Sequence, residues 1–97
     1  MGERLYTELH YEAFFQKLSD AQIHVLYVLT ENDLIPKKGI IEKLSEHYSK
    51  NPVVNAIDSL QFAGLIDFQY LKKQHKYFLS DDGIAFNEFV VAKRNRN

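Results

Sequence analysis

The stretch NPVVNAIDSLQFAGLI, residues 51–66, decides the fold because it combines a helix start, an apolar stripe, a helix stop and the beginning of a strand. Asn51 is a typical N-cap, and Pro52 suits the first helical position, where its missing N–H costs nothing. Gly64 is typical of a helix end in the left-handed conformation. The pattern therefore predicts a helix that ends at this glycine and is followed directly by an extended segment.

The residues after Gly64 change from a helical period to the alternation of a strand. Apolar and aromatic residues alternate with polar ones in two short runs, which contain Ile66, Phe68 and Tyr70 and then Tyr77 and Leu79. The polar tetrapeptide KKQH at 72–75 separates these runs, so the pattern predicts a β-hairpin with a basic tip. Ser80 is then the expected cap of a last helix over about 81–93.

Three further helices are predicted before residue 51. The pattern TELHYEAFFQKL predicts a first helix over about 8–18, with Thr7 as its N-cap. Ser19 and Gln22 form a capping-box pattern at the start of a second helix, which is apolar on most of its circumference. After a loop at 32–39, a third helix is predicted from apolar residues at helical spacing, namely Ile40, Ile41, Leu44 and Tyr48.

The composition predicts one folded domain over residues 1–97. Of these 97 residues, 45% are hydrophobic and 26% are charged, as in folded rather than disordered chains, and no linker, repeat or low-complexity tract divides them. The absence of cysteine excludes disulfides and thiolate metal sites, and it suits a cytoplasmic location. No apolar run approaches the roughly 20 residues of a membrane span, so we expect no membrane association.

Charge is unevenly distributed along the chain. The net charge is −1, but residues 68–80 contain three lysines, one histidine and no acid. The C-terminal sequence KRNRN is also basic, whereas the first 48 residues contain eight acids and five bases. A polyanion is therefore expected to be attracted to the hairpin and the tail rather than to the whole surface.

The element order α-α-α-α-β-β-α is that of a winged helix-turn-helix, a mainly α fold with a small β-hairpin, and three motifs resemble the MarR family of transcriptional regulators. LSDAQIHVLYVL at 18–29 is similar to that family's Leu-Ser/Thr-x-x-Gln-x-x-x-Leu pattern. VVNAIDSLQFAGLI resembles its recognition helix, although the connection from Leu44 to Val53 before it is about two residues longer than is usual in the family. YFLSDDG at 77–83 resembles the end of its wing, Tyr-x-Leu-Thr/Ser-x-x-Gly. The resemblance covers a core of about 18–89, and the chain looks like a truncated MarR, PadR or ArsR-type regulator.

The resemblance implies that the helix after residue 50 reads the major groove of double-stranded DNA. Its apolar residues are expected to face the core, and the outward positions at and near it are expected to meet the DNA: Lys50, Asn51, Val54, Asn55 and Ser59. Asn55 suits a bidentate contact to adenine, Val54 an apolar contact to a thymine methyl group, and Ser59 a permissive hydrogen bond. For these three side chains, an ordinary solvent-facing role is an equal alternative.

Affinity for the phosphate backbone requires cations, which this helix lacks beyond Lys50. The hairpin and the start of the third helix are expected to supply them, through Lys37, Lys38, Lys72, Lys73, His75 and Lys76. A lysine-tipped hairpin is also a common solvated turn, and lysines discourage aggregation at sheet edges. Its combination with a helix-turn-helix favours phosphate binding. Arg94 and Arg96 are expected to end the last helix rather than to contact a groove.

The first and last helices carry more apolar residues than one buried face requires. We expect helices 8–18 and 81–93 to form the interface of a homodimer through Leu9, Phe14, Phe15, Phe86, Phe89 and Val90. Such a dimer would place two recognition helices in successive major grooves of a roughly palindromic site.

Catalysis has little support in the sequence. The four histidines show no H-x-x-x-H spacing, and there is no glycine-rich phosphate loop or nucleophile motif, so we expect no enzyme activity, metal or cofactor. Nothing indicates that a small-molecule effector is required. The prediction is a small homodimeric regulator of transcription that binds specific double-stranded DNA. Two alternatives are a winged-helix protein-interaction module, favoured by the neutral recognition helix, and a plasmid or viral replication factor.

Overall fold

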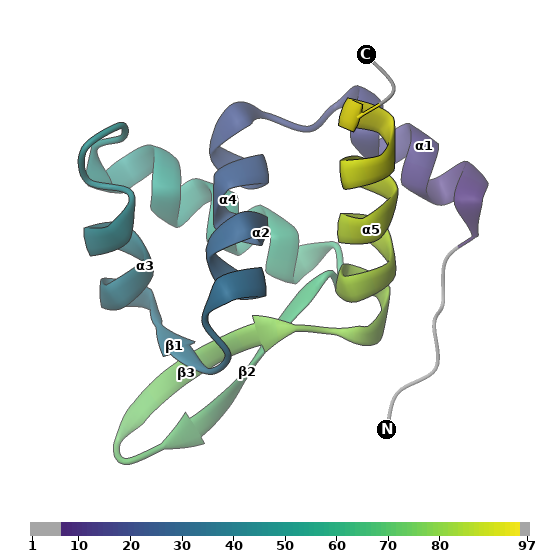
Figure 1. Ribbon diagram of the computed structural model, residues 1–97. Coiled ribbons are helices and arrows are strands. Elements are labelled where there is room, and N and C mark those ends of the chain that lie inside the picture. Colours follow the sequence, from purple (N-terminus) through teal and green to yellow (C-terminus); the bar gives the residue numbers. More distant parts are fainter. Residues whose placement is uncertain (1–6, 96–97) are drawn as a thin grey trace.

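The computed structural model describes residues 7–95, which form five helices and a three-stranded antiparallel sheet (Figure 1). The helices are α1 (Glu8–Gln16), α2 (Asp20–Glu31), α3 (Lys37–Lys43), α4 (Lys50–Phe62) and α5 (Asp81–Asn95). The strands are β1 (Ile35–Pro36), β2 (Ile66–Leu71) and β3 (Gln74–Leu79), and their order in the sheet is β1-β3-β2. This confirms the winged-helix order predicted from the sequence and adds one short strand.

The start of α2 is held by the capping box that the sequence predicts. The Ser19 side chain accepts a hydrogen bond from the Gln22 backbone N–H at 3.2 Å, and the Gln22 side chain accepts one from the Ser19 N–H at 2.8 Å. Two backbone donors that have no partner inside the helix are satisfied in this way.

Helix α4 begins slightly earlier than predicted and ends as predicted. Its N-cap is Ser49 rather than Asn51, so Pro52 is its third residue. A proline is tolerated there because the first backbone N–H groups of a helix have no partner within it. At the other end, Gly64 has φ of 80°, and the N–H groups of Gly64 and Leu65 return to the carbonyls of Gln61 and Leu60. This is a Schellman motif, which orients the chain towards β2.

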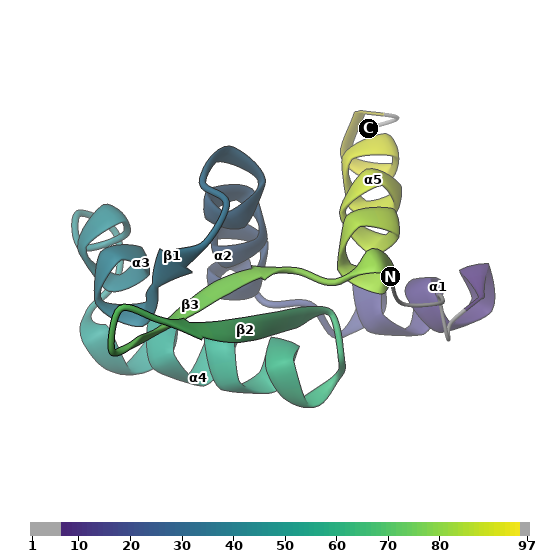
Figure 2. The same ribbon diagram turned by 90° about the horizontal axis from the view of Figure 1, so that it is seen from below.

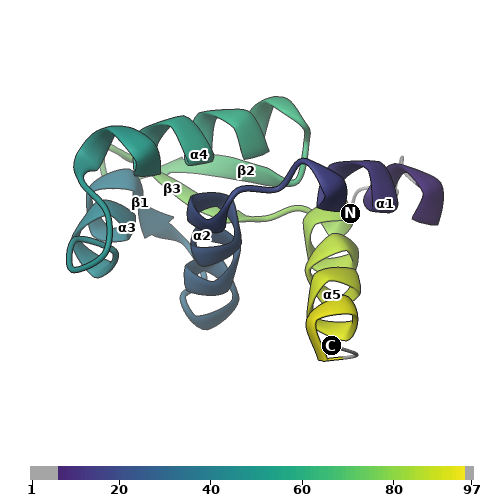
Figure 3. The same cartoon turned by 90° about the horizontal axis from the view of Figure 1, so that it is seen from above.

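The core lies where α2, α4, α5 and the sheet meet. Val25 and Leu26 of α2, Val53 and Ile57 of α4, and Phe86 of α5 are among its most deeply buried side chains. Figure 2 shows β2 and β3 running beside α4, and Figure 3 shows α2 and α5 extending away from the side of the molecule along which α4 lies. The opposite face of α4 is therefore left open. Within residues 7–95, no helix is long and apolar enough to cross a membrane.

Two predictions about the segment from residue 32 to residue 48 are wrong. The expected loop contains β1, in which Ile35 and Pro36 pair with Tyr77 and Lys76 of β3. The sequence could not indicate this strand, because two residues are too few to show alternation. Helix α3 ends at Lys43 rather than near Tyr48, because the chain continues in hydrogen-bonded turns between α3 and α4.

The terminal helices also differ slightly from their predicted bounds. Helix α1 ends at Gln16, about two residues early, and α5 continues to Asn95, about two residues late. Differences of this size are normal at helix ends, where the last turns are held by few hydrogen bonds. The prediction for Arg96 lies outside the described residues.

Candidate nucleic-acid interface

The open face of α4 carries the side chains that the sequence assigned to DNA recognition. Asn51, Asn55 and Asp58 are exposed and Val54 is half-buried, whereas Val53 and the other inward residues are buried. Lys50 is exposed at the first position of the helix. The helix therefore presents one polar, nearly neutral face, with a single cation at its N-terminus.

Ser59 belongs to this face, but its hydroxyl group is already engaged within the protein. The Gln22 side-chain amide donates a hydrogen bond to Ser59 Oγ at 2.7 Å, and Ser59 Oγ donates to the Ala56 carbonyl at 3.0 Å. The hydroxyl has only one hydrogen and two lone pairs, so a single acceptor position is left over. These bonds tie α4 to the capped start of α2, which makes Ser59 a positioning residue in this structure.

Lys37 lies between α4 and the sheet instead of extending freely into solvent. Its Nζ atom is 3.5 Å from Asp58 Oδ1, and it also lies 5.9 Å from the centre of the Tyr77 ring. Both partners of the ion pair are partly exposed, so the pair contributes little to stability, on the order of 0.5 kcal/mol. It does offset the only negative charge on the outer face of α4. Lys38, the next residue, is exposed.

The hairpin of β2 and β3 is the wing, and its tip is a two-residue turn. Lys72 and Lys73 have φ of 51° and 65°, and the flanking residues Leu71 and Gln74 pair with each other. Two successive left-handed residues are typical of the type I′ turn that closes right-twisted hairpins. Both lysine side chains are exposed, as is His75, while Lys76 is half-buried. Gln74 and His75, which the sequence placed in the tip, belong to β3.

The residues expected in the dimer interface separate into two groups. Phe86 and Val90 are 0% and 3% exposed, and Phe86 contacts the rings of Tyr11, Phe14 and Phe89 at centroid distances of 5.7–6.4 Å. Their assignment to a dimer interface is wrong for this conformation, because α1 and the core already cover them. Packing within one protomer therefore accounts for Phe86 and Val90, whereas Ile84 and Val91 of the same helix remain 49% exposed.

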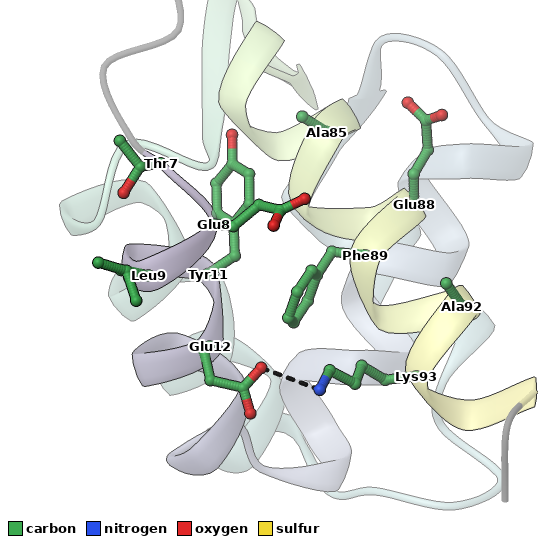
Figure 4. Close-up of a pocket in the computed structure, with 10 residues that line it drawn as sticks. All are labelled: Thr7, Glu8, Leu9, Tyr11, Glu12, Ala85, Glu88, Phe89, Ala92 and Lys93. Carbon is green, nitrogen blue, oxygen red and sulfur yellow. Dashed lines mark ion pairs between the residues drawn. The ribbon is translucent and has the colours of Figure 1, made fainter.

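The second group, Leu9, Phe14, Phe15 and Phe89, still has accessible surface. Leu9 is 83% exposed, and the three phenylalanines are half-buried. Leu9 and Phe89 line a groove of about 650 Å³ between α1 and α5 (Figure 4). Glu12 and Lys93 form an ion pair of 3.1 Å within it. These residues are the ones that a second molecule could contact.

A buried contact that the sequence did not reveal joins α1 to the start of α5. The Tyr11 hydroxyl donates a hydrogen bond to Asp82 Oδ1 at 3.2 Å, and both side chains are buried. The two residues are 71 positions apart in the chain. Neither belongs to a motif that would indicate this pairing, so only the folded structure could reveal it.

A second groove, of about 370 Å³, lies between α2 and α5 and is lined by Ile23, Tyr27, Val90, Val91 and Arg94 among others. A hydrogen bond to Glu31 and the negative charge of that carboxylate raise the pKa of Tyr27 above its ordinary value. Among residues 7–95, no three histidine or acidic side chains are placed to hold a metal ion.

The fold is shared with known regulators. The structure of MepR from S. aureus in complex with DNA superposes with a TM-score of 0.72 at 18% identity, over 92% of this chain and 73% of that one. PcaV from Streptomyces coelicolor, in complex with its natural ligand, gives 0.73 at 16% identity, over 92% and 67%. A MarR-family regulator from Silicibacter pomeroyi gives 0.67 at 21% identity, over 88% and 62%.

These similarities establish the fold: the chain has the winged-helix fold of the MarR-family transcription regulators. It spans only 60% of the length of another MarR-family regulator that it matches. No protein-family model matches the sequence, and no curated protein matches it. The likeness therefore concerns the arrangement of helices and strands, and function must be argued from the side chains.

Proposed function

We propose that the protein is a homodimeric transcriptional regulator that binds specific sites in double-stranded DNA. The observation that carries the proposal is the open polar face of α4 beside a wing with two exposed lysines at its tip. A helix of 13 residues is about 20 Å long and fits a major groove of about 12 Å width. The same fold in MepR occurs in a complex with DNA, which supports this use of it.

In the proposed complex, α4 and the wing have different tasks. Asn55 reads adenine through its amide group, and Val54 contacts a thymine methyl group. Lys50 and the wing residues Lys72 and Lys73 neutralise phosphates, which provides affinity but little sequence information. Ser59 acts indirectly, since its bond with Gln22 fixes the orientation of α4.

The proposed homodimer uses the accessible residues of α1 and α5. Leu9 and Phe89 line the groove between these helices, so a second protomer seated there would cover apolar surface that one protomer leaves exposed. Two copies of α4 must then be about 34 Å apart, one helical turn of DNA, to enter successive major grooves. This geometry requires a target site with inverted repeats.

Selection from random DNA duplexes at near-physiological salt tests the proposal directly. We expect an enriched inverted repeat whose half-sites are separated by about 10 base pairs. If all duplexes are retained without enrichment of any sequence, the protein binds DNA non-specifically and α4 does not read bases. If no duplex is retained, double-stranded DNA is not the partner.

The second candidate is a protein-interaction module, and one specific observation favours it. Phe62, in the last turn of α4, is 94% exposed, although phenylalanine is usually buried. Failure of the duplex selection would favour this reading, in which Phe62 is the anchor of a protein interface.

A further inference from the structure

One face of the wing carries a continuous row of aromatic rings that duplex recognition by α4 does not use. The strand register places Phe68 opposite Tyr77 and Tyr70 opposite His75, so all four side chains share one face. The ring centroids of successive members are 5.8 Å apart for Tyr77 and Phe68, 4.6 Å for Phe68 and His75, and 5.3 Å for His75 and Tyr70. We call these four residues the aromatic row.

Exposure increases along the aromatic row from the core to the tip. Tyr77 is buried, Phe68 is 36% exposed, His75 is exposed and Tyr70 is 65% exposed. Pairing across the two strands stabilises the hairpin, but it leaves the outer surfaces of Phe68, His75 and Tyr70 in contact with solvent. Three neighbouring rings are therefore available to a flat ligand.

Positive charge lies at both ends of the aromatic row. At the inner end, Lys37 Nζ lies over the Tyr77 ring at 5.9 Å, and at the outer end Lys72 and Lys73 form the turn. On the hairpin the one acid is Asp67, which alternation places on the opposite face of β2 and whose carboxylate accepts a hydrogen bond from the Phe68 N–H. At the inner end, Lys37 is also paired with Asp58 of α4 at 3.5 Å, so the unpaired positive charge is that of the tip. A ligand on this face therefore meets rings and cations together.

We propose that the aromatic row binds single-stranded nucleic acid, with bases stacked on Tyr70, His75 and Phe68 and phosphates held by Lys72 and Lys73 at the tip. Every base has a π face, so stacking of this kind tolerates any sequence, and flanking cations supply the attraction to the backbone. Bases within a duplex are stacked on each other and cannot use these rings. Both modes use Lys72 and Lys73, but this one does not involve α4, so we expect a change at Tyr70 to affect single-strand binding alone.

The test compares the full chain and its variants in fluorescence-anisotropy titrations. The probes are an oligothymidylate and an oligouridylate of about 10 nucleotides, with a random-sequence duplex as reference. Tyr70→Thr removes the most exposed ring while keeping a residue that favours strands. We expect it to weaken single-strand binding about 5- to 100-fold and to change duplex binding by less than about twofold.

Two matched variants make the result interpretable. Tyr27→Thr removes a tyrosine of similar exposure, 61%, from α2 and should leave single-strand binding unchanged. Tyr70→Phe keeps the ring and should bind like the parent protein, which separates stacking from any role of the hydroxyl group. Circular dichroism of each variant checks that the hairpin and helices are retained.

The proposal is overturned if the parent protein binds neither single strand, if Tyr70→Thr binds as the parent does, or if it loses duplex and single-strand affinity equally. Binding of either strand that depends on Tyr70 supports it, and comparison of the two probes shows which of them is bound more tightly. Failure of the duplex selection leaves this test intact, since its readout is single-strand affinity.

Discussion

The SDDG motif ends in Gly83, and the surroundings of this residue leave no room for a side chain. A Cβ atom built on Gly83 would overlap the Leu65 backbone carbonyl, because the first turn of α5 packs directly on the residue after the Gly64 turn. The Gly83 N–H also donates to Ser80 Oγ at 3.0 Å. Backbone cannot move aside as a side chain can, so the contact restricts this position to glycine.

Gly83→Ala is therefore expected to reduce the free energy of unfolding by about 3 kcal/mol, at the upper end of the cost of overpacking. Urea denaturation followed by circular dichroism measures this. Gly39→Ala is the control, because its Cβ would meet side chains rather than backbone, namely Ile35 at 2.9 Å and Pro36 at 3.6 Å, and alanine favours helix. Its effect should stay within about 1 kcal/mol; equal losses for both variants would contradict the explanation.

The lysines of the wing tip occupy a backbone conformation that favours asparagine and glycine. In the variant K72N/K73G the turn keeps its geometry and loses two charges. Removing left-handed strain at both positions should raise the free energy of unfolding by about 1 kcal/mol. The same change should weaken DNA binding on all sequences and reduce the slope of log K against log salt by about 2.

Titrations of one duplex at several salt concentrations measure that slope. Lys17→Asn, which removes an exposed lysine at the end of α1, should leave it unchanged. A stable K72N/K73G protein with unaltered affinity and slope would show that the wing does not contact phosphates.

For α4, the separation of buried and exposed faces allows recognition and stability to be changed independently. Asn55→Ala should leave stability nearly unchanged, because the side chain is exposed and alanine is a better helix former. It should reduce discrimination at one base position by about 1–3 kcal/mol. Competition between the selected site and its single-base variants measures the effect; loss of affinity that is equal for all bases would exclude direct readout by Asn55.

The elements that could be predicted from sequence are those held by local interactions. The capping box of Ser19 and Gln22 and the left-handed Gly64 depend on residues within a few positions of each other, so their patterns are visible in the chain. The strand β1 depends on its pairing with β3, some 40 residues away, and it has no local signal. The turns that end α3 early also have none.

In the candidate site, too, the features set by local patterns could be predicted, and those set by contacts between distant segments could not. Exposure of Asn55, Lys72 and Lys73 follows from helical periodicity and from the hairpin pattern, so the sequence placed these residues correctly on the surface. The engagement of Ser59 by Gln22, the Lys37–Asp58 pair and the burial of Phe86 each depend on a contact between distant segments. Apolar periodicity identifies a face that needs covering, but it cannot indicate whether the same chain or a second one covers it.

At the scale of the whole molecule, the exposed part of the α1–α5 surface determines the oligomeric state that we propose. Leu9→Asp places a charge in the proposed interface without disturbing the protomer core, since Leu9 is almost fully exposed. We expect the dimer dissociation constant to rise at least about tenfold. Sedimentation at micromolar concentration measures it.

Phe62→Ser is the matched control for this prediction, because it removes an exposed apolar side chain from α4 rather than from the groove. It should leave the dimer unchanged. A parent protein that sediments as a monomer at micromolar concentration would contradict the homodimer, and with it the requirement for inverted repeats.

The junction between α4 and α5 has a mechanical consequence. Ser80 Oγ donates to the Gly64 carbonyl at 2.6 Å, the Ser80 N–H donates to the Leu65 carbonyl at 3.1 Å, and Gly83 packs on the same carbonyl. We therefore expect the last turn of α4 and the first turn of α5 to move together as one rigid unit. Helix α5 has 15 residues and is about 22 Å long. A tilt of α5 by about 5° about its first turn therefore displaces its far end by about 2 Å. We therefore expect a molecule that binds the far end of α5 to change the orientation of the C-terminal end of α4.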